Sequence, residues 1–68
     1  MTTRNRAEFL VKLKQARIEA NLTQCEVGAQ MNCSQAAICK KERGARAIYA
    51  WELLELCKIY GQPLDYFL

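Results

Sequence analysis

Residues 23–44 read TQCEVGAQMNCSQAAICKKERG, and this stretch decides the fold of the chain. Thr23 and Glu26 have the spacing of a capping box, in which a side chain and a backbone group satisfy each other's free hydrogen-bonding atoms at a helix start. The spacing predicts a helix that begins at Gln24 and runs to about Met31.

A second helix is predicted directly after the first. Asn32 tolerates the left-handed backbone of a turn, and Ser34 is a good N-cap for a helix that ends near Arg43, before Gly44. Two helices of about eight residues, joined by a turn of three or four, form a helix-turn-helix. The motif is therefore expected over about 24–43.

A longer helix is predicted upstream of this motif, over Arg6–Ala20. Asn5 and Glu8 repeat the spacing of a capping box, and Asn21 is suited to the left-handed C-terminal cap. Apolar residues recur at three- and four-residue steps and form the expected inner stripe: Phe9, Leu13, Ala16 and Ala20.

Two more helices are predicted downstream. The sequence YAWELLELCKIY, from Tyr49, is amphipathic and is closed by Gly61, and Pro63 suits the first turn of a short fifth helix, PLDYFL. The inward positions of the fourth helix are Leu53, Leu56, Cys57 and Tyr60. No segment alternates with a period of two for long enough to predict a strand.

The length and composition favour a surface function. A chain of 68 residues makes one domain with a thin core, which leaves little room for a deep substrate pocket. The sequence has no histidine and no Gly-rich phosphate loop, and a cysteine nucleophile would lack its usual imidazole base. We therefore expect neither catalysis nor a cofactor.

The four cysteines raise the alternatives of a disulfide framework and a metal site. Their gaps are eight, six and eighteen residues, with no C-x-x-C pair, which fits neither alternative well. Free thiols that act as small hydrophobic side chains in a reducing compartment are expected instead. With no apolar run long enough for a signal peptide or a membrane span, a cytoplasmic location is predicted.

Charge is unevenly distributed along the chain. Over 34–46, Glu42 is the only acid, and four basic residues accompany it: Lys40, Lys41, Arg43 and Arg46. From residue 47 onward acids outnumber bases, with Glu52, Glu55 and Asp65 against Lys58. A local cationic surface indicates a one-sided contact with a polyanion, and the alternative is a solvated face without a partner.

The stretch 23–44 resembles the helix-turn-helix of the phage repressor and Cro-like (XRE-type) family of bacterial regulators. The similarity extends upstream through LKQARIEANL and downstream through LLELCKIYGQPLDYFL, so it covers nearly the whole chain. It implies a compact, all-α, five-helix, lambda-repressor-like DNA-binding domain over 1–68. It also implies sequence-specific binding to double-stranded DNA by a transcriptional regulator, in most such proteins a repressor.

Several matched positions have structural roles in that family. Gly28 is at a position kept small where the two motif helices approach each other, and Asn32 is where relatives usually have glycine. Arg17 and Glu42 match positions that form an ion pair in several relatives. The positions that the family keeps apolar are Val27, Met31, Cys33 and Ile38.

Three positions depart from the family pattern. Lys41 occupies a normally inward-facing apolar position, so either its stem crosses the edge of the core or the end of its helix is displaced. Ile48 replaces a frequent proline. Trp51 replaces a polar residue on the outer side of the fourth helix, which makes it a candidate interface anchor.

The resemblance also assigns DNA contacts. Gln35, Ala36 and Lys40 match base-contacting positions, and these side chains suit adenine, the thymine methyl group and guanine in the major groove. The phosphate-contacting positions are Gln24, Ser34, Arg43 and Arg46. For Gln24 and Ser34 the alternative is simple helix capping or solvent exposure.

A homodimer is expected because one such domain makes a DNA interface of only about 600–1,000 Å². Candidate dimer contacts, for which core packing is the alternative, are Trp51, Ile48, Tyr66, Phe67 and Leu68. A different function for the same fold is a protein-interaction module, such as an antitoxin or anti-repressor. Salt dependence separates the two functions, because DNA binding weakens steeply with salt.

Overall fold

The computed structural model describes residues 5–68, which form four α-helices and one short 3₁₀ helix. In chain order these are α1 (Arg6–Glu19), α2 (Gln24–Gln30), α3 (Gln35–Glu42), α4 (Ala50–Tyr60) and η1 (Leu64–Phe67). The described part of the chain contains no strand. None of its helices has the length and apolar character needed to cross a membrane.

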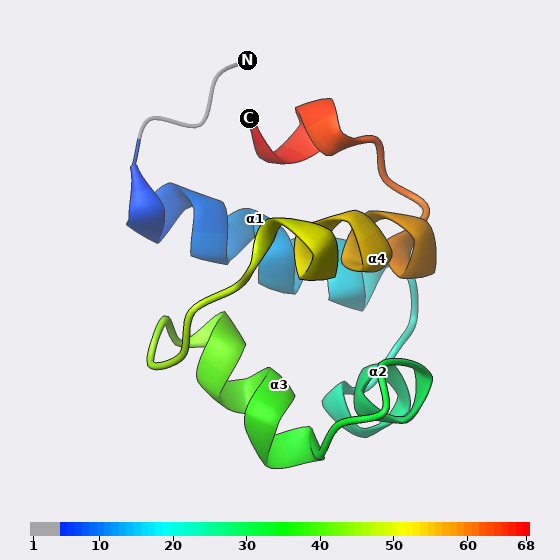
Figure 1. Ribbon diagram of the computed structural model, residues 1–68. Helices are drawn as coiled ribbons and strands as arrows, with labels where there is room; N and C mark the ends of the chain where they lie inside the picture. Colours follow the sequence, from blue (N-terminus) through cyan, green and yellow to red (C-terminus); the bar gives the residue numbers. More distant parts are fainter. Residues whose placement is uncertain (1–4) are drawn as a thin grey trace.

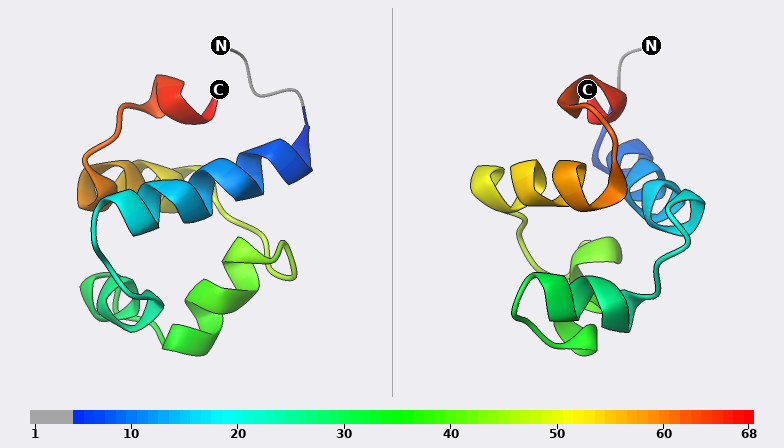
Figure 2. Two further views of the ribbon diagram at one scale, coloured as in Figure 1. Left: turned by 180° about the vertical axis from the view of Figure 1, so that it is seen from behind. Right: turned by 90° about the vertical axis from the view of Figure 1, so that its right-hand side faces the viewer.

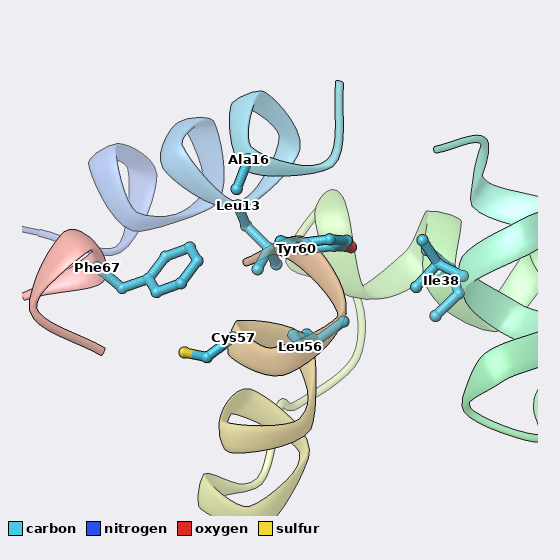
Figure 3. Close-up of a cluster of buried hydrophobic side chains, with 8 residues drawn as sticks. Leu13, Ala16, Ile38, Leu56, Cys57, Tyr60 and Phe67 are labelled. Atoms are coloured by element: carbon cyan, nitrogen blue, oxygen red, sulfur yellow. The ribbon is translucent and has the colours of Figure 1, made fainter. Parts of the chain in front are cut away.

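The helices form two layers (Figures 1 and 2). Helices α1 and α4 lie side by side in one layer, α2 and α3 form the other, and η1 lies on the far side of the first layer. The core fills the space between them with side chains from every element (Figure 3). Its buried members are Leu13, Ala16, Val27, Ile38, Leu56, Cys57, Tyr60 and Phe67.

Three helices begin at the caps that the sequence predicts. The side chains of Asn5 and Ser34 each accept a hydrogen bond from the backbone N–H three residues later, at 2.9 and 3.1 Å. Thr23 and Glu26 form the complete capping box, since each side chain accepts from the other's backbone, at 3.1 and 2.9 Å. These caps satisfy backbone donors that have no partner inside the helix, and so they fix where each helix starts.

All four α-helices end in the same way. The chain leaves each one through a residue with positive φ, namely Asn21, Asn32, Gly44 and Gly61. The next residue then donates its N–H to the carbonyl five residues back, at 2.8–3.2 Å. This is the Schellman arrangement, which turns the chain sharply and satisfies free carbonyls. The predictions for Asn21, Asn32 and the two glycines are confirmed.

The predicted bounds of the first four helices are correct to within one residue, but the predicted fifth helix is not an α-helix. The C-terminal segment is a 3₁₀ helix of four residues, in which Tyr66 N–H bonds the Pro63 carbonyl at 3.0 Å. Helices of this type close through i→i+3 hydrogen bonds and occur in short pieces, as this segment does. Phe67 is fully buried against Phe9. Of its two predicted roles, it is therefore a core residue and not a dimer contact.

Gly28 allows the close approach of α2 to the turn before α3. A Cβ atom added there would lie 2.7 Å from the Cys33 carbonyl oxygen and 3.2 Å from the carbonyl carbon of Ser34. Both neighbours are backbone atoms that cannot move without shifting α3. A small residue is therefore required, as the family pattern implies.

Gly28→Ala should destabilise the chain by about 1–3 kcal/mol. The added methyl group overpacks the turn, and this cost in free energy exceeds what is gained from alanine's higher helix propensity. Urea unfolding followed by circular dichroism measures the loss. Gln30→Ala, at an exposed position of the same helix, is the matched control and should change stability by less than about 0.5 kcal/mol. Equal midpoints for the two variants would show that the turn has spare room.

Lys41 is buried, with only 6% of its surface exposed, and α3 keeps its course to Glu42. Its ammonium group forms an ion pair with the carboxylate of Glu52, which is 8% exposed. The other oxygen of Glu52 accepts the N–H of Tyr49 at 3.0 Å, at the start of α4. Of the two alternatives for Lys41, displacement of the helix end is therefore wrong. The stem does enter the core edge, but the charge meets Glu52 instead of water.

Glu52 is ionised in this environment. Burial by itself raises the pKa of a carboxyl group, but two hydrogen bonds, from Lys41 and from the backbone of Tyr49, act in the opposite direction. Together with the positive charges of Lys41 and Arg46 they bring the pKa of Glu52 below its ordinary value. The pair therefore joins the end of α3 to the start of α4 as two full charges.

Candidate nucleic-acid interface

One side of α3 is buried and the other is open to solvent. Ala37, Ile38 and Lys41 fall on the inner side. The structure places the three predicted base-contacting residues, Gln35, Ala36 and Lys40, together on the exposed side. The side chain that leads the helix is thus a polar amide, followed by a methyl group and an ammonium group.

Gln35 is held by a chain of polar contacts that runs back to α1. Its amide nitrogen donates to the amide oxygen of Gln24 at 2.6 Å, and the amide nitrogen of Gln24 donates to Glu42 Oε1 at 3.0 Å. Arg17 Nε then donates to Glu42 Oε2 at 2.6 Å. A further hydrogen bond from Arg17 to the Leu22 carbonyl, at 2.9 Å, fixes the guanidinium against the turn between α1 and α2.

The chain of contacts fixes which way each amide faces. Since the carboxylate of Glu42 can only accept, it selects the amide nitrogen of Gln24, and the Gln24 oxygen is then left to accept from Gln35. Arg17 and Glu42 have side-chain exposures of 12% and 5%, so this anchor is sheltered from water. An exposed side chain at the start of α3 is thereby connected to a nearly buried ion pair.

Tyr60 belongs to the core (Figure 3), and its hydroxyl is close enough to this anchor to feel the charges of Glu42 and Arg17. Burial is the main reason that the pKa of its hydroxyl is raised well above the ordinary value of 10.0. The negative charge of Glu42 raises it further, and the positive charge of Arg17 opposes the rise. The hydroxyl therefore stays neutral, and Tyr60 adds no charge next to the Arg17–Glu42 anchor.

The predicted phosphate-contacting residues fall in two places. Gln24 and Ser34 start α2 and α3, where Gln24 is half-buried and Ser34 is exposed while it caps its helix. Arg43 is exposed at the end of α3. Arg46 is also exposed, but it lines a hollow with Tyr49 and the buried Lys41–Glu52 pair. The structure therefore does not bring Arg46 together with Gln24 and Gln35.

Two residues at this surface escaped the sequence analysis. Lys14 of α1 is exposed and lines a shallow hollow with Gln24 and Gln35. It lies one helical turn before Arg17, and this spacing was a signal that could have found it. Cys39 is half-buried, one turn after Gln35 on α3, and it entered the sequence analysis only as a cysteine.

All four cysteines are free thiols. Cys57 belongs to the core, where burial raises the pKa of its thiol, and Cys25 is exposed on α2. Within residues 5–68 no group of three or more metal-ligating side chains lies close enough together to hold a metal ion.

Comparison with known proteins identifies the family. A family model described as a helix-turn-helix domain matches residues 8–65, which is most of the chain and includes α2, α3 and α4 completely. Neither the search of curated proteins nor that of solved structures found a match. The family match agrees with the resemblance to Cro-like regulators, and a domain of this type suggests DNA binding. The chain therefore belongs to the helix-turn-helix domain family.

Proposed function

We propose that the chain is a cytoplasmic transcriptional regulator that acts as a repressor. In this proposal it binds a specific sequence of double-stranded DNA as a homodimer, with α3 of each copy in the major groove. The whole chain, 1–68, acts as one Cro/repressor-like domain, and no cofactor or metal takes part. The family match supports DNA binding, and the resemblance to phage repressors favours repression.

The observation that carries this proposal is the anchored amide of Gln35. A side chain that reads a base must be exposed, yet it must also be ordered, because each freely rotating group loses conformational entropy on binding. Gln35 meets both conditions through its hydrogen bond to Gln24 and the Glu42 carboxylate behind it.

Base recognition follows from the chemistry of the exposed side of α3. Gln35 can make two hydrogen bonds to an adenine, the methyl group of Ala36 can pack on a thymine methyl, and Lys40 can donate to the acceptors of guanine. Gln24, Ser34, Arg43 and Arg46 would contact phosphates on either side and set the register. Arg46 would do so at a separate point from the others. We add Lys14 to this set, because it borders the hollow beside Gln24.

Selection of binding sites from a random duplex pool, at stated salt, tests the proposal. A palindrome or near-palindrome is expected, because a dimer with twofold symmetry reads two equivalent half-sites about one helical turn apart. Enrichment of no sequence, with binding that does not respond to salt, would contradict DNA recognition.

Two substitutions in this assay separate base reading from phosphate contact. Gln35→Ala should relax the preference at one base pair per half-site, where a good bidentate contact contributes about 1–3 kcal/mol of discrimination. Arg43→Ala should weaken all sequences alike and reduce the slope of log affinity against log salt by about 1. Gln15→Ala, at an exposed position of α1, is the control. If neither variant changed the selected sequences or the affinity, the assigned roles would be wrong.

The exposed Trp51 supports an alternative function, a protein-interaction module such as an antitoxin or anti-repressor. Such a module would bind its partner with little dependence on salt. A DNA reader with about five phosphate contacts should instead show a log–log slope near −4 to −5.

A further inference from the structure

The outer side of α4 carries a stripe of residues that the core does not use. Trp51 and Leu54 are 62% and 51% exposed, although both are large apolar side chains. Glu55 and Lys58 continue the stripe at the i+4 and i+7 positions after Trp51, so all four side chains lie on one side of the helix. The inner side is occupied by Glu52, Leu56, Cys57 and Tyr60, which are buried. We call Trp51, Leu54, Glu55 and Lys58 the α4 stripe.

The two charged members of the α4 stripe have no partner among residues 5–68. Neither a hydrogen bond nor an ion pair joins Glu55 or Lys58 to another part of the described chain. One is negative and the other positive, so the stripe has no net charge. Its apolar centre is flanked by one acid and one base, and a surface with this composition is electrostatically complementary to a copy of itself.

We propose that the α4 stripe is the homodimer interface, in which α4 of one copy packs antiparallel against α4 of a second copy. With the twofold axis near Leu54, the two Leu54 side chains meet at the centre. Trp51 then lies against the stem and ammonium of Lys58 of the second copy, a favourable cation–π pair. Glu55 comes within reach of the same ammonium. The biological purpose of this dimer rests on the proposed function, but the contact itself does not.

The position of α4 suits this role. Helix α4 lies in the layer opposite α3, and its outer side faces away from the core (Figures 1 and 2). Pairing through α4 therefore leaves the exposed side of α3, with Gln35 and Lys40, free for DNA. Among the other candidate dimer contacts, Phe67 is buried, Ile48 and Tyr66 already pack on the core, and only Leu68, at 55%, is as exposed as the apolar residues of the α4 stripe.

The interface is small. A helix of eleven residues is about 16 Å long, and a contact between two such helices buries less than the roughly 1,200 Å² of stable protein complexes. The free protein should therefore dimerise weakly, and two half-sites on one duplex should bring the copies together.

The chain's only tryptophan, Trp51, provides a direct test without DNA. Its fluorescence emission should shift to shorter wavelength as the chain of residues 1–68 is concentrated, in parallel with dimerisation measured by sedimentation equilibrium. Glu55→Lys and Lys58→Glu should each weaken self-association by about tenfold, because like charges then face each other. The double variant Glu55→Lys/Lys58→Glu should dimerise at least about threefold more tightly than either single variant, because the complementary charges return. It should stay weaker than the natural sequence, because Trp51 no longer faces a cation.

Ile18→Lys is the matched control, since Ile18 of α1 is as exposed as Leu54 but lies outside the α4 stripe. It should leave self-association unchanged, whereas Leu54→Lys should abolish it. The proposal is overturned if the emission of Trp51 does not change up to the highest soluble concentration, or if the double variant dimerises no better than the single ones. If the variants dimerise in this pattern but the protein binds no DNA duplex, the α4 interface is supported and the proposed function is rejected.

Discussion

Removal of either member of the Lys41–Glu52 pair should leave most of the protein unfolded at room temperature. Glu52→Leu leaves the buried ammonium group of Lys41 without its carboxylate and removes the acceptor of the Tyr49 N–H. Lys41→Met leaves the buried carboxylate of Glu52 without its cation. A charge left alone in the interior costs about 3–5 kcal/mol, and a domain of this size rarely has more than that as its total stability. Urea unfolding followed by circular dichroism gives the free energy of unfolding.

The double variant Lys41→Met/Glu52→Leu separates charge from packing. It replaces the pair by apolar side chains of similar size, and it should be at least as stable as the natural sequence. Lys40→Met, at the exposed neighbour, is the control and should have little effect on unfolding. If the double variant were no more stable than the single ones, the pair would not be the source of the loss.

The same pair should give the protein a specific sensitivity to acid. The pKa of Glu52 is lower in the folded protein than the ordinary value of 4.5, so its contribution to stability is complete above that value. The contribution is lost as the pH falls through the lower, folded-state pKa. Stability measured between pH 7 and 3 should therefore fall less for Lys41→Met/Glu52→Leu than for the natural sequence. An equal fall in both would assign the acid sensitivity to other carboxylates.

Disruption of the Arg17–Glu42 anchor should reduce both stability and DNA discrimination. Glu42→Leu leaves the guanidinium of Arg17 nearly buried without its carboxylate and removes the acceptor that orients Gln24. We expect a loss of about 3–5 kcal/mol of stability, because one charge of a sheltered pair is left uncompensated. In the folded fraction of this variant, the preference at the base pair that we propose Gln35 reads should also relax, although Gln35 itself is unchanged.

The variant Arg17→Met/Glu42→Leu distinguishes the two effects. It should recover most of the stability, because no charge is left alone, but not the discrimination, because Gln24 still lacks its acceptor. A loss of about tenfold in preference at that base pair is expected, within the range for one bidentate contact. Lys41→Met/Glu52→Leu, which replaces a similar pair away from Gln24, should keep the preference. Recovery of full discrimination in Arg17→Met/Glu42→Leu would show that Gln24 does not position Gln35.

The sequence was most informative where the structure depends on neighbouring residues. The caps at Asn5, Thr23 and Ser34 and the left-handed turns at Asn21 and Asn32 could be predicted, because each depends on the chemistry of three to six consecutive residues. Helix bounds follow from these signals. The inner stripes were predictable for the same reason, since apolar periodicity over one helix identifies its buried side.

The long-range pairings could not be predicted from the residues themselves. Glu52 looked like one of several surface acids, because nothing local shows that α4 begins beside the end of α3. Phe67 was equally ambiguous, since a 3₁₀ helix of four residues is too short for periodicity to tell its buried side from its exposed one. For both residues the missing information was how two segments meet across the fold. Lys14 differs, because its spacing of one helical turn from Arg17 is a local signal, whereas the apolar periodicity of α1 identifies only the core side.

The shared C-terminal turn of the four helices makes the connections of this domain depend on few residues. Each turn is closed by its own backbone hydrogen bond, and only one residue in it has a positive φ. Exposed positions on the helices can therefore diverge in evolution while the domain keeps its shape, provided that asparagine or glycine remains at the four sites and a small residue remains at Gly28. The exposed side of α3 can change in this way without rebuilding the scaffold.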